Sequence, residues 1–130
     1  MIYVDTSVVL AQLLAEDRKP PAELWSGTLV SSRLLQYESW NRVHARRLVA
    51  SHGEPLRGLL GRIAFLELSP VVLERALEPF PADVRTLDAL HLASIEYLRG
   101  RRLEVSLATF DGRLLEAAGK LRIDVEEFAD

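Results

Sequence analysis

The chain has no cysteine and only two lysines, Lys19 and Lys120, and each shortage narrows what it can be. Without cysteine, neither a disulfide framework nor a thiolate metal site is possible. Arginine therefore carries nearly all of the positive charge. No apolar run is long enough to span a membrane, and the first residues lack the basic flank and apolar stretch of a signal peptide. We therefore expect a cytoplasmic protein that does not enter a membrane.

The 130 residues suffice for one domain with a hydrophobic core, and we expect a single domain over residues 1–130. A hydrophobic content of 48% excludes a disordered chain. The net charge of -3 does not by itself indicate nucleic-acid binding. Arginine pairs with phosphate through two N–H groups, but short basic clusters are usually solvated helix surface. The two clusters are Arg42, Arg46 and Arg47, and Arg99, Arg101 and Arg102.

Short apolar runs alternate with helical patterns along the whole chain. The expected strands are 2–4, 28–30, 65–68, 105–108 and 123–125. The expected helices are 6–15, 33–51, 55–64, 71–77, 86–99 and 112–118. Gly53 should end the second helix, and the double proline at 20–21 should open a loop. This alternation predicts an α/β fold with a parallel sheet and helices on both of its faces.

Asp5 and Asp111 each follow a predicted strand. Asp5 comes directly after residues 2–4, and Asp111 follows residues 105–108 closely. Ligands of parallel α/β sheets bind beyond the carboxyl ends of the strands, so the pair of carboxylates favours a site there. Each residue also precedes a helix, where an aspartate N-cap contributes roughly 1 kcal/mol. Capping explains either residue taken alone.

Glu38 lies in the long second helix, on a face that we expect to point toward the core. A carboxylate on such a face is unfavourable unless it is paired or bound to a metal ion. The alternative is an exposed ion pair with Arg42 one turn later, worth about 0.3–0.5 kcal/mol. The predicted face consists of Leu34, Glu38, Asn41, Ala45 and Leu48.

Asp88 stands in the first turn of the amphipathic helix 86–99, where a negative charge is also favourable to the helix dipole. His91 follows three residues later, on the same side of the helix. One interpretation of His91 is acid–base or metal chemistry. The other, which we favour, is a partly buried histidine that hydrogen-bonds to a neighbour.

Carboxylates gathered at one edge of a sheet repel one another unless a cation joins them. A hard divalent ion with a preference for oxygen suits such a site, so we predict Mg²⁺, with Mn²⁺ as a second possibility. The expected reaction is hydrolysis of a phosphodiester. The hydroxyls of Thr6, Ser7 and Thr109 stand nearby and either cap helices or orient the acids. The predicted metal-binding and catalytic set is Asp5, Glu38, Asp88 and Asp111.

Four fragments in this order resemble the PIN-domain family. They are Ile-Tyr-Val-Asp-Thr-Ser at 2–7, Glu38, Asp-Ala-Leu-His-Leu-Ala at 88–93 and Thr-Phe-Asp at 109–111. Each fragment alone is weak, but all four at these separations are specific and cover the whole chain. The length and the segment 88–93 are similar to VapC-type toxins of bacterial type II toxin–antitoxin modules. The stretch from Gly53 to Asp88 matches nothing specific in the family pattern.

This resemblance implies a metal-dependent endoribonuclease on a three-layer α/β/α PIN-like fold with a central parallel sheet. The acidic tetrad of the family matches Asp5, Glu38, Asp88 and Asp111, with Asp5 and Asp88 as the most direct Mg²⁺ ligands. Attack by water rather than by the RNA 2′-hydroxyl would leave 5′-phosphate and 3′-hydroxyl ends. The implied partners are an RNA substrate, a cognate VapB-like antitoxin and a second copy in a homodimer.

Three alternatives differ from the toxin hypothesis. A receiver-type signalling domain needs an acidic pair after the first strand, but this chain has Asp5-Thr6 there. Such a domain also needs a late lysine in the sheet, whereas Lys120 follows the last helix. A non-catalytic RNA-binding or protein-binding domain would bind no cation at the acidic residues. A PIN nuclease of RNA processing shares the chemistry, and only analogy separates it from a toxin.

Overall fold

The computed structural model describes residues 1–128 and contains one five-stranded sheet with the order β3-β2-β1-β4-β5. Every strand pair is parallel. The strands are β1 (Ile2–Val4), β2 (Leu29–Ser32), β3 (Ile63–Leu66), β4 (Ser106–Ala108) and β5 (Asp124–Val125). The helices are α1 (Thr6–Leu13), η1 (Ala22–Ser26, a 3₁₀-helix), α2 (Arg33–Ala45), α3 (Val49–Leu60), α4 (Pro70–Ala76), α5 (Thr86–Gly100) and α6 (Gly112–Lys120).

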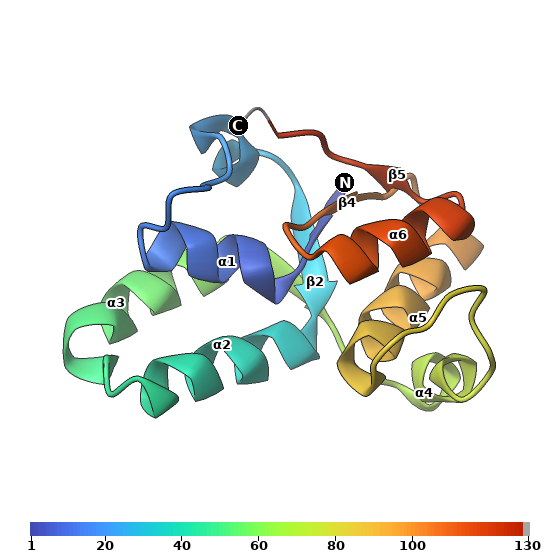
Figure 1. Cartoon of the computed structure of the whole chain (residues 1–130), viewed down its shortest axis with the longest axis horizontal. Helices are drawn as coiled ribbons and strands as arrows, with labels where there is room; N and C mark the ends of the chain where they lie inside the picture. The colour runs from blue at the N-terminus through green and yellow to red at the C-terminus, as the bar shows by residue number, and fades with distance from the viewer. Residues whose placement is uncertain (129–130) are drawn as a thin grey trace.

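Helices cover both faces of the sheet, which confirms the predicted three-layer α/β/α fold. Figure 1 shows α1, α2 and α3 on one side and α4, α5 and α6 on the other. Successive side chains of a strand point to opposite faces, so each short strand supplies both layers. In β1, Tyr3 packs in the core beneath α5 and α6, whereas Val4 packs in the core beneath α1, α2 and α3. Burial on both faces explains why β1 and β4 are apolar throughout or nearly so.

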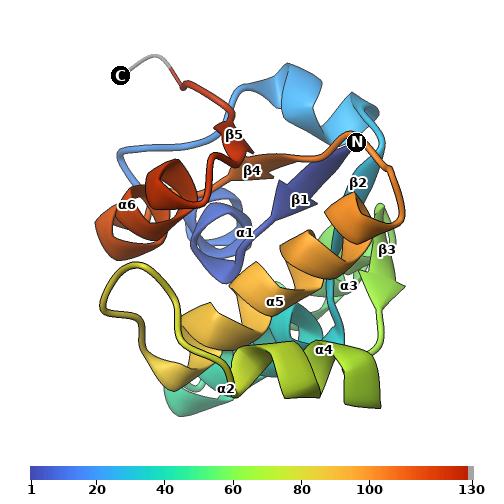
Figure 2. The same ribbon diagram turned by 90° about the vertical axis from the view of Figure 1, so that its right-hand side faces the viewer.

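The strand order reverses next to the acidic edge, which is the edge of the sheet where Asp5 follows β1 and Asp111 follows β4. From β1 the chain moves through β2 to the edge strand β3, then returns through α4 and α5 to β4 on the other side of β1. Figure 2 shows α5 running across this face of the sheet. Ligand sites of parallel sheets form where the strand order reverses, here between the carboxyl ends of β1 and β4. Val4 pairs with Ala108, so Asp5 and Thr109 leave the sheet side by side.

The predicted end of the second helix was wrong. The helix stops at Ala45, and α3 runs through both Gly53 and Pro55. The chain turns at Arg47, whose φ is 56°. Arg47 N–H donates to the carbonyl of His44, and Leu48 N–H donates to that of Val43, which is the Schellman termination of a helix. Such a turn usually carries glycine, and its absence here removed the sequence signal for the break.

Two other boundaries also differ from prediction. Strand β3 covers Ile63–Leu66 rather than 65–68, because residues 63 and 64 pair with β2 instead of continuing a helix. Part of the predicted loop after the double proline is the 3₁₀-helix η1, whose Leu24 is buried. No helix in the described part of the chain is both long and apolar enough to cross a membrane.

Candidate acidic site

Asp5 lies at the end of β1, the central strand, and caps α1. Its Oδ1 accepts hydrogen bonds from the backbone N–H of Ser7 at 3.0 Å and from the Ser7 hydroxyl at 2.5 Å. Its backbone N–H still belongs to the sheet, because it donates to the carbonyl of Ala108 at 3.1 Å. Two sets of hydrogen bonds therefore hold Asp5 in place: the last backbone hydrogen bond of the sheet and the bonds to the first turn of α1.

Asp111 occupies the equivalent position after β4, where it caps α6 through Oδ1 and the N–H groups of Arg113 and Leu114. The Thr109 hydroxyl accepts from Asp111 N–H at 2.9 Å and lies 3.3 Å from the Ser7 hydroxyl. Ser7 Oγ also accepts from Phe110 N–H at 2.9 Å. The hydroxyls of Ser7 and Thr109 thus tie the two strand exits together, as the sequence had suggested for an orienting role.

Burial raises the pKa of Asp5 above its ordinary value of 3.8, because the charged form loses its hydration. Hydrogen bonds from Ser7, the charge of His91 and the hydroxyl of Thr109 oppose that shift, and the nearby charge of Asp111 adds to it. Only 6% of Asp5 is exposed. A buried carboxylate whose charge is undercompensated is a favourable position for a cation.

Glu38 reaches the same region from α2, although the predicted buried face of that helix was wrong. The buried residues of α2 are Leu35, Ser39 and Val43, whereas Asn41 is exposed. Glu38 lies beside that buried stripe and is drawn inward by two donors, the hydroxyl of Thr6 at 2.8 Å and Nε2 of His91 at 2.8 Å.

The alternative ion pair of Glu38 with Arg42 does not form among the described residues, where the partners of Glu38 are Thr6 and His91. Thr6 directly follows Asp5 in the chain, so its hydroxyl connects Glu38 to the exit of β1. The carboxylate of Glu38 is therefore tied to the same edge of the sheet as Asp5.

His91 is buried and hydrogen-bonded on both sides of its ring, as the favoured structural interpretation required. Its Nδ1 lies 2.7 Å from the hydroxyl of Tyr3, which accepts from Ser32 N–H at 3.2 Å. Sequence reasoning missed Tyr3, which it treated only as part of an apolar run. The available signal was the hydroxyl itself, because a buried tyrosine usually finds a partner for it.

Asp88 stands in the first turn of α5, and its Oδ2 accepts from the backbone N–H of Arg85 at 3.4 Å. It is half-buried. Within residues 1–128, no hydrogen bond or ion pair joins Asp88 to Asp5, Glu38 or Asp111. The structure links Asp5, Glu38 and Asp111 through their charges and through hydrogen bonds to nearby hydroxyls. Asp88 lies one helical turn before His91.

The described residues contain no group of three or more His, Asp or Glu side chains close enough to form a ready-made cation cage. The donor set consists of carboxylates and hydroxyls, which suits a hard divalent ion that keeps several waters and takes only one or two carboxylates. In Glu38, Asp88 and Asp111, one oxygen is held by protein donors and the other accepts no hydrogen bond from the described chain.

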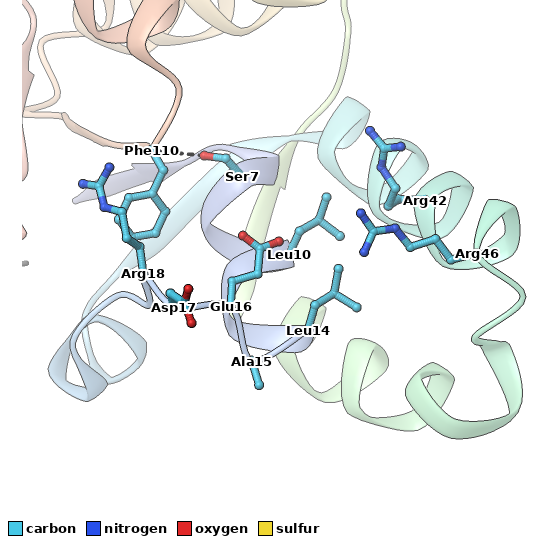
Figure 3. A pocket seen from close by; sticks show the side chains of 10 residues that line it. All are labelled: Ser7, Leu10, Leu14, Ala15, Glu16, Asp17, Arg18, Arg42, Arg46 and Phe110. Carbon is cyan, nitrogen blue, oxygen red and sulfur yellow. Dashed lines mark hydrogen bonds between the residues drawn. The ribbon is translucent and has the colours of Figure 1, made fainter.

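A groove of about 780 Å³ is lined by Ser7, which bonds to Asp5, and by Phe110, which precedes Asp111. Figure 3 shows Arg42 and Arg46 on its α2 side, with Arg46 reaching toward Leu10 of α1. The groove is not uniformly basic, because the carboxylates of the segment 16–17 also line it.

A smaller pocket of about 260 Å³ contains Thr6 and Glu38, and Leu10 and Arg42 line both hollows. Arg42 therefore stands between the acidic residues and the larger groove. One arginine of the first predicted cluster thus lines the hollow that contains Glu38. The second cluster lies at the other end of α5, away from the acidic edge.

Comparisons with known proteins identify relatives of this chain. The model of the PIN domain family matches residues 2–120. Ribonuclease VapC47 of Mycobacterium tuberculosis is 31% identical over 121 residues, which cover 88% of each chain. Ribonuclease VapC35 of the same organism is 30% identical over 132 aligned positions, covering 96% of this chain and 95% of its own.

A solved structure shows the same fold. The crystal structure of Mycobacterium tuberculosis VapC20, a toxin that cleaves the sarcin-ricin loop, matches 90% of this chain and 95% of its own with a TM-score of 0.65. The two sequences are 17% identical, so this likeness concerns the fold alone.

Proposed function

The chain belongs to the PIN-domain family and to its VapC-type ribonucleases, and we propose that its acidic edge holds a divalent cation, Mg²⁺ or Mn²⁺, for the hydrolysis of RNA. The observation that carries this proposal is the buried carboxylate of Asp5 at the exit of the central strand, where burial raises its pKa. A cation there would restore the charge balance that the described residues leave incomplete.

Four carboxylates are proposed to hold the ion: Asp5 and Asp88 directly, and Glu38 and Asp111 directly or through water. When bound, the ion supplies a Lewis acid that activates water and offsets the charge gathering on the phosphate. The protein contributes orientation, because backbone and hydroxyl donors hold the acid oxygens of Asp5, Glu38 and Asp111 in place. The exposed edge leaves one oxygen of Asp111 able to accept a proton from the attacking water.

The RNA strand is proposed to approach along the groove between α1 and α2. Arg42 and Arg46 are exposed and lie one helical turn apart, a spacing that suits consecutive contacts to phosphates. On the opposite side of the groove, the guanidinium of Arg18 lies over the ring of Phe110, 4.7 Å from its centroid, and adds positive charge there. The carboxylates of Glu16 and Asp17 would keep the backbone of the strand on the α2 side.

A cognate antitoxin of the VapB type is proposed to cover the site in the cytoplasm. An undercompensated acidic edge attracts a basic side chain, and an arginine or lysine of the partner would supply charge in place of the ion. The groove beside the site gives a partner segment a surface on which to fold during binding. A homodimer is proposed from the same family membership.

Expression in bacteria tests the toxin proposal. Wild-type protein should arrest growth, and co-expression of the small protein encoded by the neighbouring gene should relieve the arrest. The Asp5→Ala variant, expressed to the same level, should not arrest growth. Normal growth with a wild-type protein that still cleaves RNA after purification would contradict the toxin proposal in favour of a role in RNA processing.

A further inference from the structure

A chain of three side chains runs from the core to the acidic edge. The hydroxyl of Tyr3 lies 2.7 Å from Nδ1 of His91, and Nε2 of His91 lies 2.8 Å from Oε1 of Glu38. Tyr3 is fully buried, and the side chains of His91 and Glu38 are 4% and 19% exposed. The exposed fraction therefore rises from Tyr3 outward, and only the last member of the chain reaches the site.

The partners of His91 determine which of its nitrogens carries a proton. An ionised carboxylate can only accept, so the hydrogen between His91 and Glu38 belongs to Nε2. The Tyr3 hydroxyl accepts from the backbone N–H of Ser32 at 3.2 Å and lies 2.7 Å from Nδ1, so it holds the other side of the ring. A proton on Nε2 thus satisfies the contact with Glu38, while the Tyr3 hydroxyl partners Nδ1.

The rings of Tyr3 and His91 add a second constraint. They meet edge to face, with centroids 5.7 Å apart and planes at 81°. The imidazole of His91 is therefore held in one plane by packing as well as by its two hydrogen bonds. A ring held in this way aims its Nε2–H at one fixed position of the Glu38 carboxylate.

Both donors to Glu38 act on the same oxygen. The Thr6 hydroxyl donates to Oε1 at 2.8 Å, in addition to His91. Within residues 1–128, no hydrogen bond reaches Oε2. A carboxylate fixed at one oxygen by two donors has a set orientation, and its other oxygen is left available as a ligand.

We infer that Tyr3 and His91 are positioning residues of the nuclease site, which lock Glu38 by Oε1 and leave Oε2 to the cation. Neither residue touches the ion or the RNA in this arrangement. The inference rests on the proposed function in one respect, because the cation that Glu38 would serve is the proposed one. The orientation of the imidazole itself does not depend on any metal.

Two substitutions of His91 separate positioning from packing. In His91→Gln, the amide nitrogen can take the place of Nε2 and still donate to Glu38. In His91→Asn, the amide reaches only as far as Nδ1 and can contact Tyr3 but not Glu38. We expect Mn²⁺ affinity, measured by calorimetry on the purified protein, to be near wild type in His91→Gln and about 10- to 100-fold weaker in His91→Asn.

Thr6→Val and His52→Gln complete the set. Thr6→Val removes the other donor to Oε1 without shortening the side chain, and we expect it also to weaken Mn²⁺ binding. His52 lies on α3 and bonds to Ser51, so His52→Gln is a matched control whose Mn²⁺ affinity should equal that of wild type. Circular dichroism identifies any variant that fails to fold. Equal Mn²⁺ affinity in folded His91→Asn, His91→Gln and wild-type protein would overturn the inference.

Nuclear magnetic resonance of ¹⁵N-histidine-labelled wild-type protein, without metal or RNA, supplies a separate readout. We expect His91, assigned by comparison with His91→Gln, to carry a proton on Nε2, and Tyr3→Phe to change the Nδ1 shift. A proton on Nδ1 alone would overturn the inference even if the metal site is real. Wild-type protein that binds no Mn²⁺ would instead contradict the proposed function, and the tautomer would still decide the orientation of His91.

Discussion

The hydroxyl of Ser7 donates to Oδ1 of Asp5 across 2.5 Å, and this contact holds the acidic edge together. The hydroxyl oxygen of Ser7 accepts in turn from the backbone N–H of Phe110 at 2.9 Å, so one short side chain joins the exits of β1 and β4. We expect Ser7→Ala to lower stability by about 1–3 kcal/mol, because partly buried groups lose their partners. Urea denaturation measures this loss, and RNA cleavage should fall with it. An unchanged midpoint together with unchanged cleavage would contradict this role of Ser7.

The raised pKa of Asp5 predicts how stability depends on pH. Below its ordinary pKa of 3.8 the carboxyl is protonated in both the folded and the unfolded protein, so burial has no ionic cost. As the pH rises through the raised folded value, the folded state alone resists ionisation and stability falls. Asp5→Asn keeps the cap of α1 and removes this titration.

In a metal-free buffer, we therefore expect Asp5→Asn to melt at a higher temperature than wild type at pH 7, and the difference to shrink toward pH 3. Mn²⁺ should raise the melting temperature of wild type and have a smaller effect on Asp5→Asn. Melting curves over this pH range, with and without Mn²⁺, provide the measurement. A variant less stable than wild type at pH 7 without metal would show that the charge of Asp5 is already compensated.

Glu38→Gln distinguishes the observed contacts of Glu38 from an ion pair with Arg42. Glutamine retains an oxygen that accepts from Thr6 and His91, so the melting temperature without metal should be unchanged or higher. Cleavage should fall by at least about 100-fold, because a charged ligand of the ion is lost. A large loss of stability in the metal-free protein would instead indicate that an ion pair holds Glu38.

Arg42 and Arg46 should affect binding of RNA rather than folding, because both are exposed on α2. We expect Arg42→Gln and Arg46→Gln each to weaken binding of single-stranded RNA to the inactive Asp5→Asn protein. Each should also reduce the slope of log K against log salt by about one. Arg101→Gln and Arg102→Gln, at the far end of α5, are matched controls. Equal salt slopes in all four variants would place the RNA outside the groove.

Much of the fold follows from local sequence signals. Ile2–Val4 and its neighbours are short and apolar because the sheet is buried on both faces, and this predicted the strands and the layers. The end of α2 was not predicted, because Arg47 adopts a left-handed backbone conformation that sequence patterns assign to glycine. Val43 and Leu48, on either side of that turn, both pack in the core beneath α1, α2 and α3.

The residues of the site also fall into those that local sequence signals predict and those that they do not. Asp5 and Asp111 were predictable because strand exits and helix caps coincide in an α/β fold. The buried face of α2 was predicted wrongly, and the inward position of Glu38 depends on donors from two distant segments, Thr6 and His91. Periodicity within one helix cannot report a contact between residues 53 positions apart.

Cleavage of RNA by purified protein, with and without a divalent ion, tests the central claim most directly. Wild type should cleave only when Mg²⁺ or Mn²⁺ is present and should leave 5′-phosphate ends. Asp5→Asn and Asp88→Asn should lose at least about 100-fold in rate, with circular dichroism unchanged. Cleavage in excess chelator, or a wild-type rate from either variant in the same Mg²⁺ buffer, would contradict the assignment of these carboxylates to a metal-dependent ribonuclease site.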